Sequence, residues 1–544
     1  MYGLIGWMDG WMDGWINQTK NSLEMHLGSD FNLLMSLSKT IVCLVFYFGA
    51  ILYSLGNDRP NIVVILADDL GYSDIGCFGG EIETPNLDRL AHDGLRYSQF
   101  YNTSKCWTTR ASLLTGEYWQ KVTVGNGLKP ETITVADRLK DAGYRTYLSG
   151  KWHLDQNRHD DPSRNPLEFG FDKFYGNLHG AVSYFNPYTL MRGKESAAGE
   201  IGDDYYLTDA ISEEAVKNVR DHARDHNESP FFLYLSYTAP HWPLHAFPED
   251  IAKYEAYYQD KSFEQLRRAR FEKMKTLGIL PKSAQLSEAS HGDWSQVDQQ
   301  WNARRMAVFA AMVDRMDQGI GQVLAALEDT GQLENTLICF MADNGASTEL
   351  IGHNNGLSCL GGEAVTKDGR PIVIAGKEMS GDETTFQGYG PDWANVSNTP
   401  YRYFKVTSFE GGIRSPFIVH WPSGIGQERR GSIDHELLSH LIDLTPTFLQ
   451  MAGQDIPDSI DGTSVLSYWQ GKQSGNPSRV LFNHFGRSSA MYDYPWKWVQ
   501  HRGDRFLFNL EKDASETSDV SQKFPQRFNS MGQRFDQWNA SFDD

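Results

Sequence analysis

The chain has 544 residues, of which 40% are hydrophobic and 13% are aromatic. This composition excludes a disordered chain and allows a substantial core, either as one large α/β domain with a smaller one or as about two to four ordinary domains. The formal net charge of −20 argues against a nucleic acid partner, because phosphate binding needs a basic surface. An anionic substrate would need a site built locally from Arg, Lys, His or a metal.

The N-terminal residues show no periodic pattern that would predict a core element. Residues 1–34 contain the near-repeat GWMDGWMDGW, and we expect an unstructured extension or an incorrectly assigned start codon. Residues 35–56 are typical of a secretory signal peptide. Lys39 supplies the positive charge, Ile41 to Leu55 form the apolar run, and Ser54 and Gly56 are small residues suited to cleavage.

A second interpretation of the apolar run is an uncleaved membrane anchor. The run is short for a membrane span, and no other segment is apolar enough. We therefore expect a mature protein that begins near Asn57, has no stable membrane span and is either secreted or periplasmic.

The body of the chain alternates apolar runs with helical patterns, which is typical of a parallel sheet covered by helices. Four apolar runs predict buried strands that are followed at once by ionisable or amide side chains. They are Ile62–Leu66 before Asp68 and Asp69, Arg145–Leu148 before Lys151 and His153, Phe231–Ser236 before His241, and Thr336–Met341 before Asp343 and Asn344. Because ligands bind at the carboxyl ends of parallel strands, we expect these side chains to converge at one edge of the sheet.

Four of these residues offer oxygen ligands of the kind that calcium and magnesium prefer. They are Asp68, Asp69, Asp343 and Asn344. Three carboxylates in one place would repel each other strongly without a cation, so a metal site is predicted. The alternative is that the carboxylates only cap a helix near Tyr72 and a turn at Gly345.

The stretch CWTTRASLLTG, from Cys106 to Gly116, places a lone cysteine beside an arginine and several hydroxyls. We expect a helix over Thr108 to Leu114, with Cys106 at or just before its N-terminus. There the helix dipole and Arg110 would favour the thiolate and make the thiol reactive. The alternative is a small buried cysteine that packs under the sheet.

The chain has five cysteines, which are too few for a disulfide scaffold. They are Cys43, Cys77, Cys106, Cys339 and Cys359. The sequence leaves open a single bridge from Cys359 to Cys77 or to Cys339.

The motifs, taken in order, resemble those of the formylglycine-dependent sulfatases, a family in the alkaline-phosphatase-like superfamily. The family signature is Cys-x-Pro-x-Arg followed by Thr-Gly, which Cys106, Arg110 and Thr115-Gly116 match. The other similar segments are NIVVILADDLGYSDIGCFGG, GKWHL, APHWPLH, MADNG, FKVTSFEGGIRSPFIVHWP and FLFNLEKDASETSDV. The segment GPDWANVSNTPYRYFK most resembles bacterial arylsulfatases.

The resemblance implies a large mixed, mostly parallel sheet flanked by helices, with a smaller C-terminal antiparallel sheet and a helix. It implies hydrolysis of a sulfate monoester, either a sulfated carbohydrate or an aryl sulfate. In this family a formylglycine-generating or sulfatase-maturating enzyme oxidises the cysteine to formylglycine, and the hydrated aldehyde is the nucleophile. The chain departs from the signature at Thr108, where the family has proline and where the maturing enzyme reads the local sequence.

The resemblance also implies roles for single residues. One cation, calcium rather than magnesium, would be held by Asp68, Asp69, Asp343, Asn344 and the modified Cys106. Arg110 and Lys151 would steady the hydrated aldehyde, and His153 would take its proton. His241 and Lys405 would bind the sulfate and stabilise the departing alkoxide. The alternative for His241 is a turn residue between Pro240 and Trp242. Lys405 is identified by its place before Glu410-Gly411-Gly412, and without that context it would be taken as a surface lysine.

We expect a catalytic domain over residues 57–470 and a C-terminal subdomain over residues 471–544. In the latter, VLFNHF, AMYDYPWKWVQ and RFLFNL would form antiparallel strands before a closing helix. The charged stretch 249–298 predicts solvated helices. The stretch 345–398 is rich in Gly, Ser, Asn and Asp and predicts long loops at the active edge of the sheet.

Two other functions also fit the sequence. Some phosphodiesterases and phosphonate monoester hydrolases of the same superfamily use formylglycine, so the motif alone does not exclude them. A chain in which Cys106 stays unmodified could instead bind sulfated glycans without cleaving them.

Overall fold

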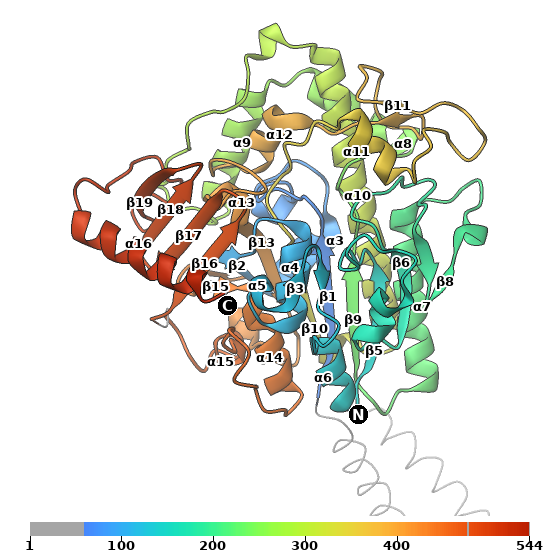
Figure 1. Ribbon diagram of the computed structural model, residues 1–544, viewed down its shortest axis with the longest axis horizontal. Coiled ribbons are helices and arrows are strands. Elements are labelled where there is room, and N and C mark those ends of the chain that lie inside the picture. The colour runs from blue at the N-terminus through green and yellow to red at the C-terminus, as the bar shows by residue number, and fades with distance from the viewer. Residues whose placement is uncertain (1–58, 476–477, 543–544) are drawn as a thin grey trace, which may run out of the picture. The chain divides into compact units, whose positions relative to one another are not determined.

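A large mixed sheet runs through the protein in the computed structural model, which describes residues 59–475 and 478–542 (Figure 1). Its strands are β1 (Asn61–Ala67), β2 (Leu95–Tyr101), β5 (Arg145–Gly150), β6 (Lys173–Asn177), β7 (Leu190–Arg192), β8 (Glu195–Ser196), β9 (Phe231–Ser236), β10 (Thr336–Ala342), β13 (Arg414–His420), β14 (Ile433–Asp434) and β15 (Ser439–His440). Their order is β14-β2-β13-β10-β1-β9-β5-β6-β7-β8, and β15 also pairs with β2.

The centre of this sheet is parallel and carries the predicted strands. Strands β10, β1, β9, β5 and β6 pair in parallel, whereas β13 and β7 run antiparallel to their neighbours. The predicted mixed, mostly parallel sheet is therefore confirmed. The strand predicted over Phe231–Ser236 has the observed bounds, and the other three extend one or two residues further than predicted.

Helices cover both faces of the sheet. Along β1, Val63 and Ile65 join one buried apolar cluster, while Ile62 and Val64 join another, because alternate strand residues point to opposite faces. The first cluster includes residues of α3 (Pro85–Asp93), α7 (Leu207–Asp225), α8 (Pro248–Gln259), α9 (Phe263–Thr276), α10 (Gln299–Asp329) and α12 (Gly390–Ser397). The second includes residues of α4 (Cys106–Thr115), α6 (Val135–Asp141), α14 (Leu444–Met451) and α15 (Leu466–Trp469). Burial on both faces explains why the strands are continuous apolar runs.

The C-terminal part forms the predicted antiparallel sheet with a helix, at the left of Figure 1. Its elements are β16 (Val480–Phe485), β17 (Ser488–Asp493), β18 (Trp496–His501), β19 (Asp504–Asn509) and α16 (Pro525–Ala540). The single strand expected over AMYDYPWKWVQ is wrong, because the chain turns at Tyr494-Pro495 and proline cannot donate to a ladder. Trp498 packs against Met531 and Phe535 of α16. The boundary at residue 470 stays a prediction.

The prediction of solvated helices over 249–298 is wrong for α9. This helix buries two arginines, Arg267 and Arg270, each 1% exposed. Arg270 forms ion pairs with Asp74 at 2.6 Å and with Glu81 at 2.7 Å. Its charged residues therefore attach the helix to the segment that follows β1, because buried cations need carboxylate partners.

Short elements connect these layers. They are η1 (Gly76–Phe78), α5 (Trp119–Val122), β3 (Thr123–Val124), β4 (Gly127–Leu128), α11 (His353–Cys359), β11 (Val373–Ile374), β12 (Thr385–Phe386) and α13 (Glu410–Ile413). The stretch 345–398 is mostly loop, as predicted, and α11 lies above the upper end of the central strands in Figure 1.

Cys77, Cys106, Cys339 and Cys359 are all buried free thiols, so neither candidate disulfide forms. Among the residues that the structure describes, no helix has both the length and the apolar character needed to cross a bilayer. The N-terminal extension, the signal peptide over 35–56 and Cys43 lie outside the described residues.

Candidate active site

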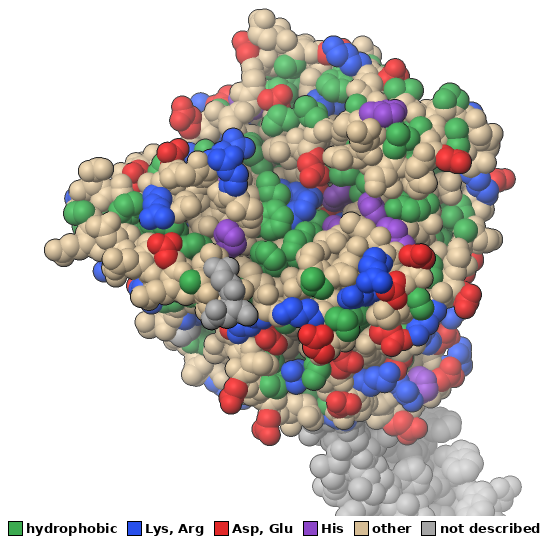
Figure 2. All heavy atoms as spheres, viewed as in Figure 1, with side chains coloured by type: hydrophobic (Ala, Val, Ile, Leu, Met, Phe, Trp, Pro, Cys, Tyr) green, Lys and Arg blue, Asp and Glu red, His purple; other side chains and the backbone are tan. Residues whose placement is uncertain are grey.

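The predicted site residues converge at the carboxyl ends of the central parallel strands. Asp68 and Asp69 follow β1, Asp343 follows the adjacent β10, and His241 and Lys151 come after β9 and β5. Figure 2 shows one face of the molecule, where histidine, basic and acidic side chains gather around a hollow near the middle. The prediction from four strand ends is therefore confirmed. The alternative that Asp69 only caps a helix near Tyr72 is wrong, because in the described part of the chain the next helical element is η1, which begins at Gly76 and has no side-chain cap.

Asp68 is the anchor of a buried ion network. Its Oδ2 atom accepts a hydrogen bond from Arg110 Nη2 at 3.0 Å and another from Lys151 Nζ. Arg110 also pairs with Asp343 Oδ2 at 3.1 Å. Burial would raise the pKa of Asp68, but the charges of Lys151, His241 and Arg110 outweigh it and hold the pKa below its ordinary value. Burial, with the charge of Asp68, raises the pKa of Asp343 to about 7.

Asp69 sits at the other side of the same cluster, with a left-handed backbone (φ 64°). Its Oδ1 atom receives Asn344 Nδ2 at 2.6 Å and lies 2.6 Å from Lys405 Nζ. Its Oδ2 atom lies 3.4 Å from His241 Nε2. Lys405, predicted from its place before Glu410, is 3% exposed and is therefore not a surface lysine.

The oxygen atoms left over in this cluster fit a divalent cation. Asp68 Oδ1, Asp69 Oδ2 and Asn344 Oδ1 are buried without a hydrogen bond in the described structure. Uncompensated buried oxygens are costly, so they are normally satisfied by a donor or a metal. Ligand atoms of Asp68, Cys106 and Asp343 lie within 4.8 Å of one another, as do those of Asp68, Asp69 and His241. Hard oxygen donors of this kind suit calcium or magnesium.

Cys106 is the first residue of α4 and is 1% exposed. The helix starts two residues earlier than predicted, and no side chain among the described residues caps its N-terminus. The Thr108 side chain, which stands where the family signature has proline, is buried. Its Oγ1 atom bonds Thr103 Oγ1 at 2.6 Å and donates to the Lys105 carbonyl at 2.8 Å. These bonds hold the loop before Cys106 against the first turn.

His153 follows β5 with a left-handed backbone (φ 58°) and turns its ring toward Gly180. A Cβ atom at Gly180 would lie 2.4 Å from the ring, so any larger residue there would displace it. Burial, together with the charges of Lys151 and Arg110, holds the pKa of His153 well below its ordinary value. Its Nδ1 atom has no hydrogen bond within the described structure. The ring is thus neutral and able to accept a proton.

His241 is oriented by the main chain of the next residue. Its Nδ1 atom lies 2.6 Å from the Trp242 carbonyl oxygen, to which it donates, so Nε2 is the nitrogen that faces Asp69. Burial lowers the pKa of His241 to about 4, although Asp69 and Asp68 oppose this shift. An anionic group bound beside the ring would raise that pKa and allow the ring to act as an acid.

Sequence reasoning missed the residues at the mouth of the site. Glu349 accepts a hydrogen bond from the Trp242 indole and lies 3.7 Å from Lys105 Nζ. Burial would raise the pKa of Glu349, but Lys405, Lys105 and His241 hold it below its ordinary value. Lys105 could have been suspected because it precedes Cys106, whereas Glu349 lies in a loop with no distinguishing pattern.

Comparisons with known proteins identify the family. Residues 60–454 match the model of the sulfatase family, and residues 401–526 match the C-terminal domain of N-sulphoglucosamine sulphohydrolase. The chain is 33% identical to an arylsulfatase of Klebsiella aerogenes over 75% of this chain and 90% of that protein. It is 28% identical to human N-acetylgalactosamine-6-sulfatase over 81% of this chain and 72% of that protein.

Solved structures show the same fold. The structure of Ps i-CgsB in complex with k-i-k-neocarrahexaose is 27% identical, with a TM-score of 0.63 over 88% of this chain and 93% of that one. The phosphonate monoester hydrolase from Silicibacter pomeroyi, at 19% identity and a TM-score of 0.53, shares the fold alone. With its alkaline-phosphatase-like fold and this set of relatives, the chain belongs to the sulfatase family and is an enzyme that hydrolyses sulfate esters.

Proposed function

We propose that the enzyme cleaves sulfate monoesters with a formylglycine made from Cys106 and with a calcium ion. The ion would be held by Asp68, Asp69, Asp343, Asn344 and the modified residue 106. The observation that carries this proposal is the set of buried, unsatisfied oxygens beside Cys106 at the ends of β1 and β10. Oxygen ligands with flexible geometry favour calcium over magnesium, which demands near-ideal octahedral geometry.

The cation and the modified residue would each supply one kind of chemistry. A bound divalent cation would offset negative charge on the sulfuryl oxygens. A hydrated aldehyde at position 106 would offer one hydroxyl for attack on sulfur and a second whose deprotonation releases sulfate. The cluster has three carboxylates and three cations from Arg110, Lys151 and Lys405. A divalent cation would make it net positive, which favours an anionic ester.

The side chains of the chain divide the remaining work. Arg110 and Lys151 hold Asp68 and keep a positive field at the first turn of α4. His153 is neutral and would take a proton from a hydrated aldehyde at position 106. His241 and Lys405 bind the sulfate group and stabilise the oxygen of the leaving alcohol.

The substrate is a sulfated carbohydrate or an aryl sulfate. The arylsulfatase of Klebsiella aerogenes and the relative crystallised with k-i-k-neocarrahexaose support these two leaving groups. Maturation requires a formylglycine-generating or sulfatase-maturating enzyme that accepts Thr108. In line with the signal-peptide pattern over 35–56, the protein acts outside the cytoplasm, secreted or in the periplasm.

Turnover of matched esters tests this function. Enzyme from its own host should hydrolyse an aryl sulfate at least about 100-fold faster, in kcat/KM, than the matching aryl phosphate or phosphonate. The reverse order would favour the phosphodiesterase or phosphonate hydrolase alternative. No hydrolysis, with retained binding of sulfated glycan, would favour the non-catalytic binder, which family membership and the complete set of site residues disfavour.

A further inference from the structure

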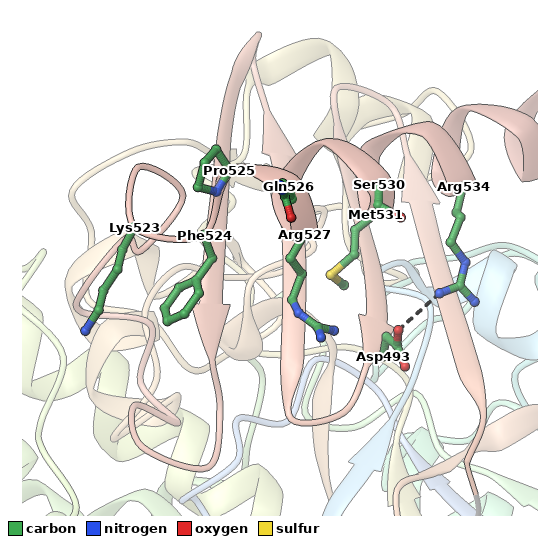
Figure 3. A pocket seen from close by; sticks show the side chains of 9 residues that line it. All are labelled: Asp493, Lys523, Phe524, Pro525, Gln526, Arg527, Ser530, Met531 and Arg534. Atoms are coloured by element: carbon green, nitrogen blue, oxygen red, sulfur yellow. Dashed lines mark hydrogen bonds and ion pairs between the residues drawn. The ribbon is translucent and has the colours of Figure 1, made fainter.

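A groove of about 660 Å³ lies beside the C-terminal sheet, at the first turns of α16 (Figure 3). The side chains of Arg527 and Arg534 extend from the helix toward the strands, and Lys523 and Phe524 precede the helix. Asp493 lies opposite, at the end of β17. None of these residues belongs to the active site, so the groove is a separate surface.

The groove is positively charged on a strongly acidic protein. Three of its side chains are cations and one is a carboxylate, whereas the whole chain has 70 acidic and 50 basic residues. Arg534 pairs with Asp493 at 3.1 Å, and their side chains are 44% and 35% exposed, so this pair is weak. In the described part of the chain, Lys523 and Arg527 form no ion pair. Lys523 and Arg527 can therefore bind an anionic ligand directly, and Arg534 is held only by this weak pair.

Aromatic rings hold these cations in place and add a stacking surface. The rings of Phe524 and Trp496 meet edge to face at 4.8 Å. The guanidinium of Arg527 lies 5.0 Å from the Trp496 ring centre, and Lys523 Nζ lies 5.6 Å from that of Phe524. Cation–π contacts restrict both charged side chains, which lowers the entropy lost on binding. Phe524 is 36% exposed and can pack against the apolar face of a sugar ring.

We propose that this groove is an exosite that binds a sulfated polysaccharide chain. Arg527 and Arg534 are two helical turns apart, so their charges are spaced about 10 Å along one side of α16. That spacing suits an extended chain with repeated sulfate groups better than a single small anion. A planar guanidinium group can donate two parallel hydrogen bonds to two oxygens of one sulfate group.

The exosite would raise the concentration of polymeric ester near the catalytic centre. This role in turnover rests on the proposed function, since it concerns how a sulfated substrate is held while one of its esters is hydrolysed. Binding of a sulfated polysaccharide to the groove does not depend on the proposed function. A polymer bound to the groove has a high effective concentration at the catalytic centre. The groove should therefore lower KM for polymeric esters and leave KM for small esters unchanged.

Binding of full-length protein to dextran sulfate, measured by affinity electrophoresis, tests the proposal. The double variant Lys523→Ala/Arg527→Ala should bind at least about tenfold more weakly, because losing one charge-assisted hydrogen bond already has about that effect. Ser530→Glu, which adds a negative charge in the groove without removing packing, should act in the same direction. The matched control Lys217→Ala/Arg220→Ala removes two exposed cations from α7 and should bind as wild type does.

Several results would overturn the proposal. Unchanged binding in both groove variants would do so, as would an equal loss in the α7 control. Binding of poly-glutamate or single-stranded DNA as tight as that of dextran sulfate, with the same dependence on Lys523 and Arg527, would show a general polyanion site instead. Turnover of a small aryl sulfate should be unchanged in the groove variants. Absence of that turnover in wild type would contradict the proposed function but not the exosite.

Discussion

Replacing Lys405 with methionine removes one charge from the centre of the site with little change in side-chain volume. Lys405 Nζ lies 2.6 Å from Asp69 Oδ1, and both side chains are 2% exposed. Burial would lower the pKa of Lys405, but Asp69 and Glu349 outweigh it and raise the pKa well above its ordinary value. Lys405 is therefore charged at neutral pH. A fixed charge beside the reacting group contributes about 3–4 kcal/mol, so kcat/KM should fall by about 10²–10³.

The same substitution should also increase the stabilisation that the protein gains from bound calcium. Asp69 loses a buried ion-pair partner, which costs about 3–5 kcal/mol of stability in metal-free protein. A cation bound by Asp69 would offset that loss. The variant should therefore gain more in Tm from calcium than the wild type does, because the ion replaces the missing charge.

Both effects are measured on one set of proteins. The assays are kcat/KM with an aryl sulfate and thermal unfolding in chelator and in calcium. Lys405→Arg keeps the charge and should retain part of the activity, and the exposed Lys282→Met serves as a matched control. A kcat/KM for Lys405→Met within about threefold of wild type would refute the role in turnover. A calcium-induced shift in Tm equal to that of wild type would refute a cation beside Asp69.

Three further predictions concern the nucleophile, the cation and the C-terminal sheet. Cys106→Ala should abolish turnover, while calcium should still raise its Tm. Near-normal activity of this variant would contradict the proposed nucleophile. Exhaustive chelation should abolish turnover and added calcium should restore it; full activity in verified metal-free enzyme would contradict the carboxylate cluster. Lys497 is fully buried between Glu410 at 2.8 Å and Glu516 at 2.7 Å. Replacing it with methionine should lower the free energy of unfolding by about 3–5 kcal/mol. Burial raises the pKa of Glu516 to about 7, and Lys497 opposes that shift. Because Glu516 becomes protonated and loses its charge as the pH falls from about 8 to about 6, the stability lost in Lys497→Met should become smaller over that range. A loss of stability that does not change with pH would contradict this ion network.

The sequence predicted the sheet and the catalytic cluster because both follow from local rules. A buried strand is a continuous apolar run, and the first polar residue after it marks the edge where ligands bind. Asp68, Lys151, His241 and Asp343 were found in this way. Lys405 needed the family resemblance, since no strand end precedes it.

The features that escaped prediction depend on contacts between distant segments. Glu349 reaches the site through a loop, and its partner Trp242 lies 107 residues away in the chain. From the sequence, Arg270 resembles a solvated helix residue, because only the fold brings Asp74 and Glu81 into contact with it. Charged residues follow the same pattern in sequence whether they face water or a buried carboxylate, so periodicity alone cannot separate the two.

The most direct test of the mechanism is the mass of the peptide that contains Cys106, from protein purified from its own host. Formylglycine at this position is the predicted result, and it would show that the host's maturing enzyme accepts Thr108. An unmodified cysteine in protein that still hydrolyses sulfate esters would contradict the proposed nucleophile.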